Sequence, residues 1–360
     1  MNTLTSEKTG AGYRPLVINA GTEGSVDLRD LIKTHKPTVV DTIEEQLMEL
    51  VKMERPDYVF SDEEARLAAR ARLGENPENY GCWVYYPWKN TVVHLLGEAE
   101  FVKVRTNRNQ YKITPQEQDL LARKRVGIIG LSVGSGVALA MAMERTAGEL
   151  RIADYDTLDL SNMNRLRTSV TNLGVAKAEL VAREIAEIDP FLKVTLYSSG
   201  ITAENIAEFL DGNDAPLDLL VEECDSLPIK ILARVEARRR ALPVIMETSD
   251  RGMVDVERFD IDQNLGILHG RITDAECEEL LTTGTWTPEV TAKIMTMKET
   301  SDRMRRSVME LGKTITRWPQ LASEVTAGAG VVTHLSRKIL LGDHLIRGRK
   351  FLDPYELFVD

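Results

Sequence analysis

Short apolar runs and amphipathic segments alternate along most of the chain after Lys124. Between the runs, residues 175–188 show the clearest helical period, with Val181, Ile185 and Ile188 on one face. Strands that alternate with helices at this spacing predict a largely parallel, doubly wound α/β sheet, in which ligands bind beyond the carboxyl ends of the strands. The runs expected to form strands are Val126–Ile129, Leu150–Ala153, Val194–Tyr197, Leu217–Val221 and Pro243–Met246.

The N-terminal part of the chain carries a different pattern and predicts a smaller region of mixed α/β type. A helix is expected over 43–51, and the capping-box pair Ser61 and Glu64 opens a second helix. Trp83–Trp88 and Val92–Leu96 resemble two short strands. The aromatic residues of the first strand either form a peptide-binding edge or pack this region onto the next domain, and we favour packing. The apolar face of the first helix consists of Ile43, Leu47, Leu50 and Val51.

The pattern weakens after about residue 260. Residues 262–301 predict a long connection with one or two helices, and a final helix follows Trp318 and Pro319. Gly328 and Gly330 in this helix are expected to allow close packing. The apolar positions of the final helix are Leu321, Val325, Val332 and Leu335.

Composition limits the possible classes of protein. A length of 360 residues corresponds to about two domains, which we place at 1–105 (accessory) and 106–360 (main). The 45 basic and 56 acidic residues leave a net charge of -11, which argues against a general binder of nucleic acid or anionic membranes. The apolar runs are too short to span a membrane. The N-terminus has no signal-peptide pattern, so we expect a cytoplasmic protein.

A turn rich in small residues follows the first predicted strand of the main domain. The run VGIIGLSVGSG, residues 126–136, leads from a strand through Gly130 and Gly134 into a helix, where backbone N–H groups can hold a phosphate. Its glycines do not match GxGxxG. The same letters contain a GxSxG around Ser132, which with Asp225 and His269 is also compatible with a hydrolase. The turn alone does not separate these two interpretations.

Charged residues at the following strand ends favour the nucleotide. Asp154 ends the second strand, 24 residues after Gly130, where a carboxylate can accept both ribose hydroxyls. Arg165 and Lys177 supply positive charge suited to a polyphosphate, and Asp225 follows a third strand at a position that could hold a divalent cation. A hydrolase has no use for this set of charges.

These residues occur in an order that resembles the ThiF/MoeB superfamily of ATP-dependent adenylating enzymes, which includes ubiquitin-activating enzymes and the maturases of microcin- and pantocin-type peptides. The resemblance covers 106–360 and implies a Rossmann-like sheet. Trp318–Val325 also resembles the closing helix of a bacterial subgroup. The four motifs are met by Asp154 and Asp156, by Ser161, Asn162 and Arg165, by Gly174 and Lys177, and by Asp225 and Ser226.

Three features depart from the family pattern. The glycine turn is shifted from the usual spacing. The interval from Arg165 to Lys177 is one residue short, which leaves Arg167 as a substitute. The paired CxxC motif of many relatives is missing, and no structural zinc is expected. Some relatives complete the site with an arginine from a second subunit, and Arg105 and Arg108 are the candidates here.

The resemblance implies that ATP and Mg²⁺ bind and that a substrate carboxylate attacks the α-phosphate, giving an acyl-adenylate and pyrophosphate. It implies a homodimer, with Arg165, Lys177 and Asp225 catalytic and Asp225 on the metal. The residues expected to bind the nucleotide are Gly130, Ser132, Gly134, Asp154, Asp156, Asn162, Arg165, Lys177, Asp225 and Ser226.

The expected substrate is a carboxylate on a peptide or a small carrier protein. Cys277 lies beside acidic residues that would raise its pKa, and Cys224 is expected in the core, so direct attack by a nitrogen or carbon nucleophile is favoured over an enzyme thioester. This chemistry would suit the maturation of ribosomal peptide natural products, with residues 1–105 holding a leader peptide or carrier protein. Three alternatives stay open: activation of a sulfur-carrier or ubiquitin-like protein, a catalytically silent nucleotide-binding scaffold, and a hydrolase that uses Ser132.

Overall fold

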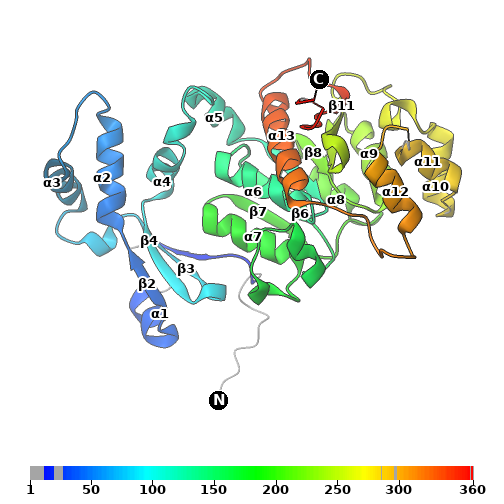
Figure 1. Ribbon diagram of the computed structural model, residues 1–360. Coiled ribbons are helices and arrows are strands. Elements are labelled where there is room, and N and C mark those ends of the chain that lie inside the picture. Colours follow the sequence, from blue (N-terminus) through cyan, green and yellow to red (C-terminus); the bar gives the residue numbers. More distant parts are fainter. Residues whose placement is uncertain (1–11, 20–26, 285, 296–297, 357, 360) are drawn as a thin grey trace. The chain divides into compact units, whose positions relative to one another are not determined.

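The computed structural model describes residues 12–19, 27–284, 286–295, 298–356 and 358–359 (Figure 1). The N-terminal stretch in which we found no signal-peptide pattern lies mostly outside these residues. The described residues divide into two compact units. Unit 1 comprises those within Met1–Pro115 together with Arg183–Phe191, and unit 2 comprises those within Gln116–Ala182 and Leu192–Asp360.

Unit 1 contains a sheet of mixed direction with strand order β1-β3-β4-β2. Strand β3 pairs antiparallel with β1 and β4, and β2 pairs parallel with β4. The elements are β1 (Leu16–Ile18), α1 (Leu28–His35), β2 (Thr38–Asp41), α2 (Ile43–Glu54), α3 (Asp62–Leu73), β3 (Cys82–Tyr86), β4 (Thr91–Leu95) and α4 (Glu98–Arg105), with short 3₁₀ turns at Pro77–Asn79, Pro87–Lys89 and Asn107–Asn109.

The predicted helices and strands of this region are confirmed. The four apolar positions expected on the face of α2 are all buried, and Ser61 and Glu64 form the capping box at the start of α3. Strand β3 lies between two neighbours, so the idea that its aromatic residues form a peptide-binding edge is wrong. These side chains are buried in two clusters of unit 1, one of which includes Phe191.

Unit 2 is built on a seven-stranded sheet with the order β11-β10-β9-β8-β5-β6-β7. The strands are β5 (Arg125–Ile129), β6 (Glu149–Ala153), β7 (Lys193–Tyr197), β8 (Leu219–Glu222), β9 (Val244–Thr248), β10 (Met253–Glu257) and β11 (Gly348–Phe351). The helices are α5 (Pro115–Leu121), α6 (Gly134–Glu144), α7 (Lys177–Ile188), α8 (Ile206–Asp211), α9 (Leu227–Arg239), α10 (Asp274–Thr283), α11 (Pro288–Met295), α12 (Asp302–Glu310) and α13 (Ala322–Leu340), with 3₁₀ turns at Leu160–Asn164, Val170–Asn172, Asp250–Gly252 and Ile267–Gly270. The part of α7 from Arg183 onward belongs to unit 1.

All five predicted strands form a parallel ladder, which confirms the doubly wound α/β fold. The sequence pattern did not reveal β10 and β11, which extend this ladder antiparallel at one edge. Strand β10 carries buried charged residues that obscure its apolar pattern, and two of the four residues of β11 are basic.

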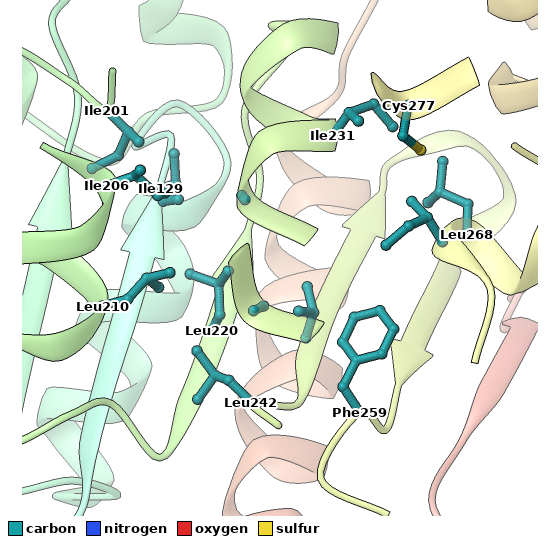
Figure 2. Close-up of a cluster of buried hydrophobic side chains, with 14 of the residues drawn as sticks. Ile129, Ile201, Ile206, Leu210, Leu220, Ile231, Leu242, Phe259, Leu268 and Cys277 are labelled. Atoms are coloured by element: carbon teal, nitrogen blue, oxygen red, sulfur yellow. The ribbon is translucent and has the colours of Figure 1, made fainter. Parts of the chain in front are cut away.

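Helices cover both faces of the sheet. A large apolar cluster fills the space between the sheet and helices α8, α9 and α10, with Ile129, Leu220 and Ile231 among its members (Figure 2). Gly127 on β5 has no room for a side chain there, because a Cβ would lie 2.9 Å from the ring of Phe209. On the other side, α13 packs against α6 and β9.

The two glycines of α13 differ in their surroundings. A Cβ on Gly328 would lie 2.5 Å from the carboxyl carbon of Glu247, which confirms close packing at this position. A Cβ on Gly330 would meet nothing within 4 Å, so the prediction of close packing is wrong at this position.

Within the part of the chain that the structure describes, no helix combines the length and apolar character needed to cross a membrane.

Candidate functional site

The candidate site lies where β5 and β8 run side by side, because the chain turns in opposite directions across the sheet after these two strands. The loop after β5 begins at Gly130, whose φ of +86° is a left-handed conformation that favours glycine. A Cβ at this position would lie 2.8 Å from the backbone of Glu223 and Cys224, which follow β8. Gly130 therefore brings the two strand ends into direct contact.

Asp154 ties the glycine turn to the second strand. Its Oδ2 accepts a hydrogen bond from the backbone N–H of Leu131 at 2.7 Å, and its Oδ1 accepts one from the N–H of Asp156 at 2.8 Å. Burial raises the pKa of Asp154, and the two N–H donors and the charge of Lys177 oppose that rise. These two hydrogen bonds are compatible with a contact to ribose hydroxyls, since each carboxylate oxygen has a second lone pair.

Lys177 stands at the centre of the site. Its side chain is 4% exposed, and its Nζ donates to Ser132 Oγ at 3.0 Å and to Asp156 Oδ2 at 2.9 Å. The structure thus brings together residues from the glycine turn, from the segment after β6 and from the start of α7. An ammonium group held at the entrance to α6 is well placed for a phosphate.

Arg165, which follows the short turn Leu160–Asn164, is half-buried. Its Nη1 donates to Asn164 Oδ1 at 2.9 Å, while its Nε is buried with no hydrogen-bond partner among the described residues. Burial lowers the pKa of Arg165, and the negative charge of Asp225 opposes this effect. The proposed substitute, Arg167, is exposed. A buried donor without a protein acceptor is expected to be satisfied by a ligand, so this nitrogen is available to donate to a ligand oxygen.

Three other predicted nucleotide residues serve local structure. Asn162 is buried, and its Oδ1 accepts from the N–H of Asp159 at 3.0 Å, closing a capping box around the short turn that precedes Arg165. Ser226 caps the N-terminus of α9 by its backbone position, without a side-chain hydrogen bond to the helix. Gly134 begins α6, and a Cβ there would lie 2.9 Å from Ile128.

Asp225 is exposed and lines a cavity of about 350 Å³ beyond the ends of β8 and β9. In the described part of the chain, no three His, Cys, Asp or Glu side chains are grouped so as to hold a metal ion by themselves. A single carboxylate fits Mg²⁺ that is held mainly by phosphate oxygens and water.

The same cavity contains two acidic residues that sequence reasoning missed. Glu223 follows β8, and Glu247 lies on β9 with only 4% of its surface exposed. Burial raises the pKa of Glu247 to about 8, with a further contribution from the charge of Glu324. Burial and the charges of Glu247 and Glu222 raise the pKa of Glu223 well above its ordinary value. The signal was present in the sequence, because both glutamates interrupt runs that otherwise predict buried strand ends.

The structure does not assemble the hydrolase triad. Ser132 has Lys177 as its partner, and His269 Nε2 lies 2.6 Å from Oδ1 of Asp255 rather than beside Asp225. Cys277 is buried in the same apolar cluster as Ile231 (Figure 2), and burial raises its pKa to about 11. Burial also raises the pKa of Cys224, whose Sγ donates to Glu222 at 3.0 Å. The two cysteines lack the properties of a reactive thiolate.

Fold and site together define a doubly wound α/β protein whose strand ends hold a glycine turn, a buried lysine and an acidic cavity. Residues 105–285 match the model of the ThiF family. The chain belongs to this family, as the order of its motifs predicted.

Similar proteins were found by sequence and by structure. The chain is 43% identical over 306 residues to "Uncharacterized protein MT1398" of Mycobacterium tuberculosis (strain CDC 1551 / Oshkosh), covering 83% of this chain and 42% of that protein. It is 29% identical over 157 residues to the tRNA threonylcarbamoyladenosine dehydratase of Bacillus subtilis (strain 168), covering 43% of this chain and 60% of that protein. The chain therefore spans less than two thirds of the length of both relatives.

The crystal structure of the E. coli tRNA N6-threonylcarbamoyladenosine dehydratase aligns with a TM-score of 0.48 and 18% identity, covering 69% of this chain and 98% of that chain.

Proposed function

We propose that this protein binds ATP and adenylates a carboxylate on a peptide or small carrier protein, producing an acyl-adenylate for attack by a nucleophile. The observation that carries the proposal is the buried Lys177 ammonium, which is held between the glycine turn and Asp156 where a polyphosphate would enter the doubly wound sheet. Membership of the ThiF family supports the same chemistry.

The chemistry follows from charge and position. A carboxylate substrate with an ordinary pKa near 4 is ionised at neutral pH, so its attack on the α-phosphate needs no general base. Lys177 and the Nε of Arg165 would neutralise the phosphates, and Asp154 would keep the glycine turn in place while it contacts the ribose. Mg²⁺ would be held by Asp225 together with phosphate oxygens, and it would stabilise the negative charge of the departing pyrophosphate.

Further parts of the proposal concern the surroundings of this site. Residues 1–105 would hold a leader peptide or carrier protein, the active form would be a homodimer, and the location would be the cytoplasm. An acceptor that attacks the acyl-adenylate directly is favoured, because Cys224 and Cys277 are poor thiolates. Activation of a sulfur-carrier protein would use the same adenylation step and differ in its acceptor.

Exchange of pyrophosphate into ATP tests the adenylation step. Purified protein would be supplied with candidate peptides, carrier proteins and, because one relative is named for a tRNA nucleoside, tRNA. We expect exchange that depends on one substrate and falls by about a hundredfold or more in Lys177→Ala and Asp225→Ala.

The matched control is Lys193→Ala, which removes an exposed lysine of the same unit and should leave exchange unchanged. Equal exchange rates in Lys177→Ala and the control would contradict the proposed role of Lys177. Tight ATP binding without exchange for any substrate would favour the scaffold interpretation.

A further inference from the structure

Glu247 presents an unusual combination of burial and lack of partners. It lines the cavity beyond β8 and β9, is 4% exposed, and neither oxygen of its carboxyl group has a hydrogen-bond partner among the described residues. Among the described residues, the neighbouring carboxylate of Glu223 accepts a hydrogen bond from the backbone N–H of Glu247 at 3.0 Å. A buried carboxyl group without a donor costs free energy unless a ligand supplies one.

The other charged side chains of the cavity already have partners. Lys230 Nζ lies 2.7 Å from Glu222, Arg349 pairs with Asp255 at 2.5 Å, and Glu299 pairs with Arg271. Asp250 accepts hydrogen bonds from the backbone and side chain of Ser301. Glu223 and Glu247 therefore remain as two buried acidic groups that form no ion pair with a basic side chain of the described residues.

Helix α13 leaves space for the Glu247 carboxyl group. Gly328 faces it so closely that a Cβ would lie 2.6 Å and 2.7 Å from its two oxygens. Any other residue at this position would push the carboxyl group away. Gly328 on α13 and the unpartnered carboxyl group of Glu247 on β9 therefore depend on each other: the glycine leaves the space that the carboxyl group occupies.

We propose that the Glu223 and Glu247 carboxyl pair binds the ammonium group of an aliphatic primary amine, and that this amine is the acyl acceptor. This inference rests on the proposed adenylation and names the class of its second substrate. An ammonium ion supplies both the donors and the positive charge that the pair lacks.

The walls of the cavity favour an organic amine over a metal ion. They include Met246, Ile294, Trp318 and Phe351, which suit an alkyl stem and, in the case of Trp318, can also contact a cation through the ring face. Mg²⁺ prefers a shell of oxygen ligands and water, and the described residues offer no group of three metal-ligating side chains here.

The transfer step balances when both carboxyl groups of the pair are ionised, so that each can accept one proton. The ammonium ion gives one proton to Glu247, and the neutral amine nitrogen attacks the carbonyl carbon of the acyl-adenylate. The new C–N bond forms as the C–O bond to AMP breaks, and AMP leaves with the electron pair. Glu223 takes the second proton from nitrogen, so the products are an amide, AMP and two protons on the carboxyl pair.

Binding of a simple amine tests the site without any acyl substrate. The full-length protein would be titrated with n-butylammonium chloride at constant ionic strength, with tryptophan fluorescence as the signal because Trp318 lines the cavity. We expect saturable binding that n-butanol does not reproduce and that weakens about tenfold or more in Glu247→Gln. Trp318→Phe should abolish the signal.

Glu278→Gln is the matched control, because it makes the same change at an exposed residue of α10 outside the cavity lining, and it should bind the amine like the wild type. Gly328→Ala is a second disruptive variant, and we expect it to weaken binding of the amine by displacing the Glu247 carboxyl group. Equal affinity in Glu247→Gln and wild type, equal binding of n-butanol, displacement by millimolar Mg²⁺, or no binding at all would overturn the proposal. ATP affinity, measured separately by calorimetry, should survive Glu247→Gln and fall in Lys177→Ala, so failure of the amine site and failure of the nucleotide site are distinguishable.

Discussion

Burial changes the behaviour of individual acidic side chains in unit 2. Asp154 is buried but accepts two backbone hydrogen bonds, whereas Glu247 is buried and accepts none from the described residues. The same carboxyl chemistry thus organises a loop in one place and remains available to a ligand in the other. The difference lies in whether backbone N–H groups point at the carboxylate.

The raised pKa of Glu247 predicts a dependence of stability on pH. A carboxyl group whose pKa rises to about 8 on folding stabilises the folded state below its ordinary value of 4.5, and this contribution is lost as the pH rises through 8. Glu247→Gln should therefore unfold with a free energy about 3 to 5 kcal/mol higher than wild type at pH 9, and close to wild type at pH 4. Urea denaturation at both pH values measures the difference. A constant difference across this range would contradict the prediction.

At the scale of elements, β10 and β11 close one edge of the sheet through buried charges. Asp255 on β10 lies between His269 and Arg349, and the nearby Arg234 on α9 bridges Glu222 and Glu257. Burial raises the pKa of Asp255, but the hydrogen bond from His269 and the charge of Arg349 outweigh that effect and bring it to about 2. These pairs explain how a strand with charged residues can be fully buried.

The His269–Asp255 pair predicts a second effect of pH. The hydrogen bond to Asp255 raises the pKa of His269 and outweighs its burial, so the pair stabilises the fold fully below pH 6.5 and less as the pH rises through the raised value. Each unit of that rise corresponds to about 1.4 kcal/mol. His269→Gln should have a lower free energy of unfolding than wild type at pH 5.5, and this difference should become smaller as the pH rises to 9. Chemical denaturation measures the difference. The exposed His344→Gln is the matched control and should show no such change.

At the scale of the whole molecule, unit 1 is assembled from two separate parts of the chain. Asp189, just after α7, is fully buried and accepts from Arg105 Nη2 at 2.8 Å, and both residues belong to unit 1. Arg105, one of the two candidates for an arginine supplied to a partner subunit, forms this local pairing within its own chain. A truncation at residue 106 would therefore remove the partner of a buried carboxylate as well as the accessory region.

Arg105→Ala should destabilise unit 1 by about 3 to 5 kcal/mol, because it leaves the buried Asp189 without its guanidinium partner. Arg108→Ala, which removes an exposed arginine three residues further along, should change stability by less than about 0.5 kcal/mol. Thermal unfolding of the two variants provides the comparison. Similar melting temperatures for both would show that the buried pair contributes little.

Much of the fold could be predicted, because local signals agree with the tertiary structure. The five parallel strands, α2, the capping box of α3 and α13 follow from apolar period and capping residues. The antiparallel edge could not be predicted, since β10 depends on ion pairs with residues as distant as Arg349. In the site, the ordered motifs identified Lys177 and Arg165, but no local pattern indicated that Glu247 and Gly328 would meet.

The sequence alone determined the doubly wound sheet, the glycine turn and the charged residues at its strand ends, because these depend on periodicity and on order along the chain. Only the tertiary structure decided which charges are neutralised and which are not. Lys177 donates hydrogen bonds to Ser132 and Asp156, and Arg234 forms ion pairs with two glutamates. The carboxyl group of Glu247 has no hydrogen-bond donor among the described residues. The physical reason is that burial and pairing depend on which distant segments pack together, and these contacts set both the pKa of a buried group and its readiness to bind a ligand.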